Sequence, residues 1–341
     1  MDMREEYLRR VALHQQEELS LSQAGFSELL LAVRKDPQSF TRREDDQALA
    51  LLADELDRYY QSAKKDDLLD DEEFMKVRTQ RLAHLRGVCS QALALDPRCT
   101  DAALCDAIAR DLNPEDLLVE LMRIEAAAEG DYLVPRGEGA LGGTGDTAPA
   151  TGAAEGAADL WQDVFAHPLL RVKAAMARAL LDTARYRMAI GKAQEAMHLA
   201  PSDVLGTRHT ALLCHARLED ERGFDQLDAA YQRRGDAWQG LGRVILLYKL
   251  GRIAAAKRAL RGFDHLCEGG IYALIRPILV DSYMPDRPAC APYSFREATM
   301  AVHEADPIVV DVPDLPSWAE SIPEMRQSAK AFAERMGFDW Y

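Results

Sequence analysis

Cys214 and His215 stand next to each other in the chain, with His209 five residues before Cys214, and all three are side-chain types that bind metals. A zinc site needs further ligands at a recognised spacing, and this chain has no C-x-x-C pair to supply them. Its six cysteines are scattered: Cys89, Cys99, Cys105, Cys214, Cys267 and Cys290. We therefore expect no metal site, and we interpret the cysteines as free, partly buried thiols in a reducing compartment.

Motifs for nucleophilic, hydride-transfer or phosphoryl chemistry do not occur in the sequence. It contains no G-x-x-x-x-G-K-[ST], no H-E-x-x-H, no G-x-S-x-G, and no G-x-G-x-x-G after a strand. The glycine-rich stretch 137–145 lacks both the preceding strand and the following lysine of a phosphate loop. Carboxylates are plentiful, but abundance does not identify an acid–base pair. We expect a non-enzymatic protein without a cofactor, and the role of a regulatory subunit of an enzyme stays open.

Charge is distributed unevenly along the 341 residues. The whole chain has a formal net charge of −15, yet 171–261 holds 17 Lys and Arg against 9 Asp and Glu. A basic segment inside an acidic protein favours an acidic partner, although solvated helix faces with a chance excess of charge are an equally weighted interpretation. Nucleic acid is a further alternative, which the acidic remainder of the chain disfavours because it would repel phosphates.

Composition indicates a folded protein outside the membrane. Hydrophobic residues make up 48% of the chain, and no apolar run approaches the roughly 20 residues that span a bilayer. The first twenty residues carry charges throughout, unlike a secretory signal peptide. We expect a cytoplasmic location.

A stretch rich in glycine, alanine and threonine, 131–158, separates two helical regions. It has almost no large apolar residues after Val134, so it cannot bury enough surface to offset the entropy of ordering. We predict a flexible linker there, and its LVPRG segment (Leu133–Gly137) predicts a protease-sensitive point. Before it, Leu49, Leu52, Leu56 and Tyr59 form a helical stripe.

Small residues recur after the linker at a period near 34. The stretch from Thr183 to Asp203 reads as a helix end, a turn and a second helix that Ala200-Pro201 stops. Helical segments are expected at 160–184, 186–200, 204–218, 222–233, 237–250 and 252–266. When the three helix pairs are aligned, small or turn-facing residues fall into columns: Ala184, Leu218 and Gly251; Ala177, Ala211 and Val244; Ala189, Gly223 and Ala256; Ala196, Ala230 and Phe263.

These columns, with Tyr186 after the first turn and Pro201 closing the first unit, resemble the tetratricopeptide repeat (TPR) family, whose repeat is about 34 residues of helix–turn–helix. The family's first-helix tryptophan is absent from unit one, which has Lys173. The resemblance implies an all-α fold in which stacked pairs form a solenoid. Four regions follow: an N-terminal helical region (1–130, either degenerate repeats or another helical domain), the linker (131–158), the repeat domain (159–305), and a C-terminal extended segment with a capping helix (306–341).

The resemblance also implies a partner-binding groove lined by the first helix of each pair. The groove positions carried over from the family include six polar or aromatic residues that we expect to contact a partner: Arg171, Arg178, Arg208, His215, Trp238 and Tyr248. Arginine can pair with carboxylates in two-point contacts, and tryptophan and tyrosine supply rigid contact area. The expected ligand is therefore a protein or peptide with acidic and apolar side chains.

The function that follows is a protein–protein interaction scaffold. Chaperone tails are unlikely ligands, because clamp-type family members use groove asparagines and this chain has only Asn113. A contact between the basic repeats and the chain's own acidic N-terminal half, such as Asp66–Glu73, is a further hypothesis motivated by the charge asymmetry. The sequence also predicts an extended segment at 308–312 and helices at 295–304 and 323–336.

Overall fold

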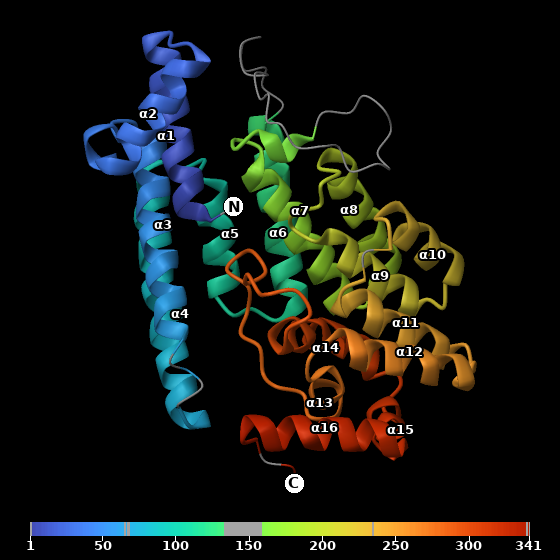
Figure 1. Cartoon of the computed structure of the whole chain (residues 1–341). Coiled ribbons are helices and arrows are strands. Elements are labelled where there is room, and N and C mark those ends of the chain that lie inside the picture. The colour runs from blue at the N-terminus through green and yellow to red at the C-terminus, as the bar shows by residue number, and fades with distance from the viewer. Residues whose placement is uncertain are drawn as a thin grey trace. The chain divides into compact units, whose positions relative to one another are not determined.

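The computed structural model describes residues 2–64, 66, 69–132, 159–233, 235–338 and 340. Within these ranges all regular structure is helical and no strand occurs, which confirms the all-α prediction (Figure 1). Asp131 and Tyr132 end the helix α6 (Pro114–Tyr132). The rest of the predicted linker, including its LVPRG segment, lies outside the described residues.

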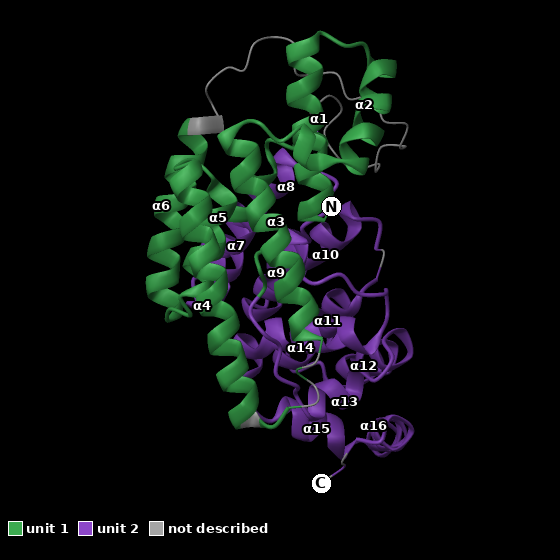
Figure 2. Cartoon of the chain, turned by 90° about the vertical axis from the view of Figure 1, so that its left-hand side faces the viewer, with its two compact units in different colours: residues 1–145, 160–172, 283–286 green, residues 146–159, 173–282, 287–341 purple. Residues whose placement is uncertain are grey.

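The chain divides into two compact units (Figure 2). Unit 1 comprises Met1–Gly145, Leu160–Val172 and Tyr283–Asp286, and unit 2 comprises Asp146–Asp159, Lys173–Ser282 and Arg287–Tyr341. The regions expected from the sequence were each continuous. In the structure, 160–172 and 283–286 instead join the N-terminal helices.

Polar side chains cap the starts of three helices of unit 1. Its helices are α1 (Met3–Leu19), α2 (Gln23–Lys35), η1 (Pro37–Ser39), α3 (Glu44–Ala63), α4 (Asp71–Leu95), α5 (Thr100–Ala109), α6, η3 (Leu160–Gln162) and the beginning of α7 (His167–Asp182). Asp2, Ser22 and Asp70 cap α1, α2 and α4 by accepting hydrogen bonds from backbone amides. The acidic run that ends at Glu73 lies at the start of α4, where negative charges complement the helix dipole.

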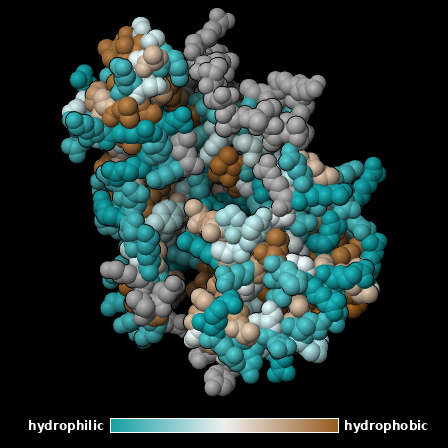
Figure 3. All heavy atoms as spheres, viewed as in Figure 1, coloured by the Kyte–Doolittle hydropathy of each residue, from teal (hydrophilic) through white to brown (hydrophobic). Residues whose placement is uncertain are grey.

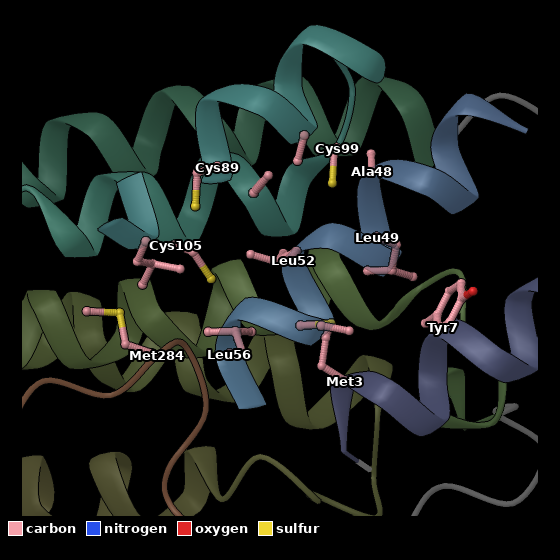
Figure 4. Close-up of a cluster of buried hydrophobic side chains, with 14 of the residues drawn as sticks. Met3, Tyr7, Ala48, Leu49, Leu52, Leu56, Cys89, Cys99, Cys105 and Met284 are labelled. Carbon is pink, nitrogen blue, oxygen red and sulfur yellow. The ribbon is translucent and has the colours of Figure 1, made fainter. Parts of the chain in front are cut away.

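The core of unit 1 lies between α1, α3, α4 and α5 (Figure 4). The predicted stripe is confirmed: Leu49, Leu52, Leu56 and Tyr59 are all buried. Three buried cysteines, Cys89, Cys99 and Cys105, belong to the same cluster. All six cysteines are free, and five are buried, which confirms that they are free thiols and mostly buried.

The helices of unit 2 that the structure describes begin within α7 and continue through the helix pairs expected from the sequence. Its further helices are α8 (Tyr186–Leu199), α9 (Thr207–Arg217), α10 (Glu221–Ala230), α11 (Ala237–Lys249), α12 (Ile253–Leu266), α13 (Gly270–Ile275), α14 (Phe295–Val309), α15 (Leu315–Ser321) and α16 (Pro323–Met336). The ends of α8–α12 lie within three residues of the predicted ones. Below, α7, α9 and α11 are the first helices, and α8, α10 and α12 are the second helices.

The same turn joins the first to the second helix in each of the three pairs. A residue in the left-handed backbone region stands two positions after the first helix ends: Ala184 (φ 58°), Glu219 (φ 58°) and Gly251 (φ 68°). The next amide bonds a carbonyl five residues back, in the Schellman pattern. In the second pair this turn residue is Glu219, one position after Leu218, which the period of the repeat predicts for the turn.

Alanines allow the helices of unit 2 to approach closely. Ala177 of α7, Ala193 of α8 and Ala211 of α9 form one buried cluster, with Met197 and Leu227 packed against it. Ala189, Ala193 and Ala196 are buried along one face of α8, as their spacing predicts.

The prediction of an extended segment at 308–312 is wrong. Ile308 and Val309 end α14, which passes through Pro307, and 310–312 form a turn. Ile308 lies on the helical face of Ala301 and Ala305, and all three are fully buried. Burial of this face outweighs the backbone hydrogen bond that proline removes. After the unpredicted helix α15, α16 has the predicted bounds, 323–336.

Candidate functional site

The first-helix face of unit 2, where the sequence places a partner groove, is covered by the chain itself. Helix α14 packs against both α9 and α11. Leu212, Leu241 and Ile245 of that face are at most 2% exposed. Apolar residues of α9 and α11 therefore form core rather than an open groove.

Arg287, just before α14, anchors this cover to α9. Its Nε and Nη2 lie 2.7 Å from the two carboxylate oxygens of Glu304 in α14. Its Nη1 donates to the carbonyls of Leu205 (2.5 Å) and Gly206 (2.8 Å), and Nη2 also lies 3.2 Å from Oγ1 of Thr210. Both charged side chains of the ion pair are at most 10% exposed. One guanidinium thus neutralises a buried carboxylate and donates to two carbonyl oxygens that directly precede α9.

Arg208 lies between two aspartates, Asp203 in the turn before α9 and Asp236 at the N-cap of α11. Its Nη1 is 3.1 Å from Asp203 Oδ2 and its Nη2 is 2.9 Å from Asp236 Oδ2. Asp203 also accepts from the amide and hydroxyl of Thr207, and Asp236 caps α11 by accepting from the Gln239 amide. This predicted partner residue therefore serves as a bridge between the starts of α9 and α11.

Asp236 has a strongly perturbed carboxyl group. Burial alone would raise its pKa, but the contact with His209, the charges of His209 and Arg208, and the Gln239 amide outweigh burial. The pKa of Asp236 is consequently held well below its usual range. The pKa of His209 is lowered, chiefly by burial.

Trp238, a second predicted partner residue, is 4% exposed. Its ring meets the edge of the His209 ring at 4.2 Å, and the Arg287 guanidinium lies 5.6 Å from its centroid. Among the residues that the structure describes, none accepts a hydrogen bond from its Nε1. The structure thus places the Trp238 side chain inside unit 2.

His215 and Tyr248 also contact neighbours within unit 2. His215 is 7% exposed, and its Nδ1 lies 2.9 Å from Asp220 Oδ2. Tyr248 is half-buried, donates to Asp314 Oδ2 at 2.6 Å, and its ring lies 4.9 Å from that of Trp318. Arg178 is half-buried on α7, where its charge acts on Asp182 one turn later. Of the predicted residues in unit 2, Arg178, Arg208 and Tyr248 are half-buried, whereas His215 and Trp238 are buried.

Arg171, the remaining predicted residue, belongs to unit 1 and is 1% exposed. Its guanidinium contacts three carboxylates: Glu6 Oε2 at 2.6 Å, Asp286 Oδ2 at 3.0 Å and Asp101 Oδ1 at 3.2 Å. Burial would raise the pKa of Glu6, but Arg171 and Arg10 hold it well below its usual range. Arg171 thus belongs to unit 1, whereas the other five predicted residues belong to unit 2.

His167 completes this buried cluster in unit 1. Its Nδ1 lies 2.9 Å from Glu6 Oε2, and its Nε2 lies 2.9 Å from the Trp161 carbonyl oxygen. The Trp161 ring stacks on the imidazole at 3.9 Å. The cluster ties α1, α5, the start of α7 and 283–286 into one unit.

The acidic and basic partners of these residues are not predicted from the sequence. Asp236 is the N-cap of α11, where aspartate is common, so a helix-start signal was present for it. Asp203 lies four residues before α9, whose N-cap is Gly206. For Arg287, Glu304 and Asp286 no local pattern indicates a partner, because the paired residues are far apart in sequence.

One group of possible metal donors lies in unit 1. Donor atoms of His14, Asp45 and Asp46 fall within 4.8 Å of one another. His14 Nδ1 is 3.0 Å from Asp46 Oδ1, and Arg43 contacts both oxygens of Asp45. Each donor thus already has a partner from the chain, and the group fits an ion-pair network.

The basic segment 171–261 is largely neutralised by the same chain. At least ten of its 17 basic residues form ion pairs with carboxylates: Arg171, Lys173, Lys192, Arg208, Arg217, Arg243, Lys249, Arg252, Lys257 and Arg261. Fewer cations are then available for phosphates, which disfavours the nucleic-acid alternative.

No family model, curated protein or solved structure matches the chain. Among the described residues, no helix is both long and apolar enough to cross a membrane.

Proposed function

We propose that the chain is a non-enzymatic protein–protein interaction scaffold with three TPR-like helix pairs, α7–α8, α9–α10 and α11–α12. The recurrence of one turn geometry carries the proposal. The amides of Arg185, Asp220 and Arg252 bond the carbonyls of Leu180, His215 and Leu247 at 2.8–3.0 Å. Helix pairs that repeat in this way stack into extended binding surfaces.

Helix α14 has the chemistry that the sequence led us to expect of the groove ligand. Its buried side chains are both acidic and apolar, and they include Glu297, Glu304, Met300 and Ile308. Because the chain's own helix fills this place, we assign partner binding to the opposite side of the helix pairs. The outer face, as used below, means the exposed residues of the second helices.

The outer face is polar and carries basic side chains. Arg187, Arg222 and Arg258 are exposed on α8, α10 and α12, and Met188 and Ile253 are 60% and 46% exposed beside them. Figure 3 shows polar residues predominating on the side of the molecule where α10 and α12 lie. Exposed cations with scattered apolar side chains suit a partner segment that is acidic and partly apolar.

Charge reversal on the outer face tests this proposal. We would compare proteins captured by the wild type with those captured by Arg187→Glu/Arg222→Glu/Arg258→Glu. A matched control, Lys35→Glu/Arg42→Glu/Arg98→Glu, changes three exposed basic residues of unit 1 by the same charge. We expect partners of the wild type to remain with the control and to fall by about 10-fold or more with the outer-face variant. Equal capture by all three folded proteins would refute the outer face as the binding surface.

Contact between the repeats and the acidic N-terminal half stays a prediction. Asp66–Glu73 includes residues outside the described ranges. A salt-dependent association between separately produced halves would support such a contact.

A further inference from the structure

Four residues enter unit 1 from a part of the sequence that otherwise builds unit 2. The segment Tyr283–Asp286 belongs to unit 1, whereas Lys173–Ser282 and Arg287–Tyr341 belong to unit 2. Met284 is 1% exposed and joins the cluster that contains Leu52, Leu56 and Cys105 (Figure 4). So short an insertion buries a large apolar side chain in a core made by other helices.

Unit 1 contacts this segment in at least three chemically distinct ways. Its apolar core receives the Met284 side chain. The Tyr60 hydroxyl of α3 donates to the Met284 carbonyl at 2.6 Å. Arg171 Nε donates to Asp286 Oδ2 at 3.0 Å. An apolar anchor, a main-chain hydrogen bond and a charge pair together specify a short peptide in both sequence and direction.

The receiving groups are held by residues outside the segment. Arg171 is fixed by Glu6 and Asp101, which lie on α1 and α5. The Tyr60 ring meets the Tyr59 ring edge-on at 5.6 Å. Because these contacts do not involve 283–286, they can orient the receiving groups before the peptide binds, which lowers the entropic cost of binding.

We propose that unit 1 is a peptide-binding module that recognises a methionine two residues before an aspartate, and that Tyr283–Asp286 occupies this site in cis. The occupant that we assign in trans is a segment of a partner protein with the same Met-x-Asp chemistry. The site is formed by unit 1, whereas the outer face is formed by the second helices of unit 2, and the proposal does not rest on that proposed function. A covalently connected segment has an effective concentration of about 1 mM, so a partner must compete with it.

The test uses the full chain and a fluorescent peptide with the sequence of 282–287, SYMPDR. In the variant Met284→Gly/Asp286→Gly the segment in cis loses both anchoring side chains. We expect this variant to bind the peptide about 10-fold or more tightly than the wild type does. A peptide with glycine in place of methionine should not bind, and adding Tyr60→Phe to the variant should weaken binding several-fold.

The proposal would be overturned if the folded Met284→Gly/Asp286→Gly variant does not bind the peptide. It would also be overturned if that variant binds the peptide without methionine equally well. If that variant does not fold, the wild type is irradiated with the peptide carrying a photoreactive methionine analogue. Labelling of α3 or α5, suppressed by excess unlabelled peptide, supports the site, and its absence at millimolar peptide overturns it. If wild-type chains dimerise as their concentration rises and exchange their 283–286 segments, the occupant in trans is a second copy of this chain and not a separate partner protein.

Discussion

Arg287 and Glu304 form a two-point ion pair, with both nitrogen–oxygen distances at 2.7 Å, beneath the surface of unit 2. The pair joins the segment before α14 to α14 itself, while the same guanidinium reaches the start of α9. It thereby holds a helix of acidic and apolar side chains over the first helices.

Removing the cation of this pair should strongly destabilise unit 2. We expect Arg287→Met to lower the free energy of unfolding by about 3–5 kcal/mol, because Glu304 would stay buried without its counter-charge. Urea denaturation monitored by circular dichroism measures the loss. Arg258→Met, at an exposed position of α12, should change stability by only about 0.5 kcal/mol. The double variant Arg287→Met/Glu304→Leu should recover part of the loss; no recovery would mean that the carbonyl contacts dominate.

Replacing Arg171 has different expected effects under the sequence-based interpretation and under the structure. If Arg171 were a groove residue, replacing it would reduce partner binding and leave the free energy of unfolding unchanged. As the buried centre of Glu6, Asp101 and Asp286, its replacement by methionine should cost about 3–5 kcal/mol of unfolding free energy. Arg178→Met, at a half-buried position two turns later, should cost clearly less. Similar melting temperatures for the two variants would contradict the buried cluster.

Acid should weaken unit 2 partly through Asp236. Its pKa is depressed in the folded state, so its stabilising contribution is complete above the unfolded value of about 3.9 and is lost as the pH falls toward the folded value. Asp236→Asn keeps a side chain able to cap α11 but removes the titration. The stability difference between wild type and variant should shrink by about 1 kcal/mol from pH 5 to pH 3, measured by urea unfolding. A constant difference over that range would show that Asp236 does not carry this proton linkage.

The repeated turns predict stability changes of opposite sign. Ala184 adopts a left-handed conformation that costs a residue with a Cβ about 1 kcal/mol, so Ala184→Gly should stabilise the chain by up to about 1 kcal/mol. Gly251→Ala should destabilise it by a similar amount, about 1 kcal/mol, because a Cβ there meets open space and only the backbone conformation is affected. Thermal denaturation of both variants measures these effects. Changes of the same sign would contradict an equivalent geometry in the first and third turns.

The helices were predictable where local signals agreed with packing. The alanine face of α8 and the stop at Ala200-Pro201 gave its bounds to within one residue. At 306–310 the local signals were misleading, because Pro307 and the β-branched residues after it suggest an extended chain. There the buried position of Ile308 decides the structure, and burial depends on residues far away in sequence.

The sequence predicts which residues lie on the first-helix face, but it does not predict that they contact other parts of the same chain. Arg208 and Trp238 do stand on the first-helix face, yet the spacing of residues within one helix cannot reveal what covers that face. The partners of Arg171 come from positions 70 to 165 residues away. Such pairings follow from the arrangement of helices in three dimensions, which no single periodic pattern encodes.

The discontinuity of unit 1 has a consequence for its biosynthesis. A ribosome that has already released α1, α3 and α5 must still synthesise about 180 residues before Met284 can join Cys105 in the core, which takes roughly 10–40 s. During that interval the apolar site of a nascent chain has no cis segment to fill it. The N-terminal helices are therefore the part of this protein for which a molecular chaperone, or a methionine-bearing peptide from elsewhere, has the longest opportunity to bind.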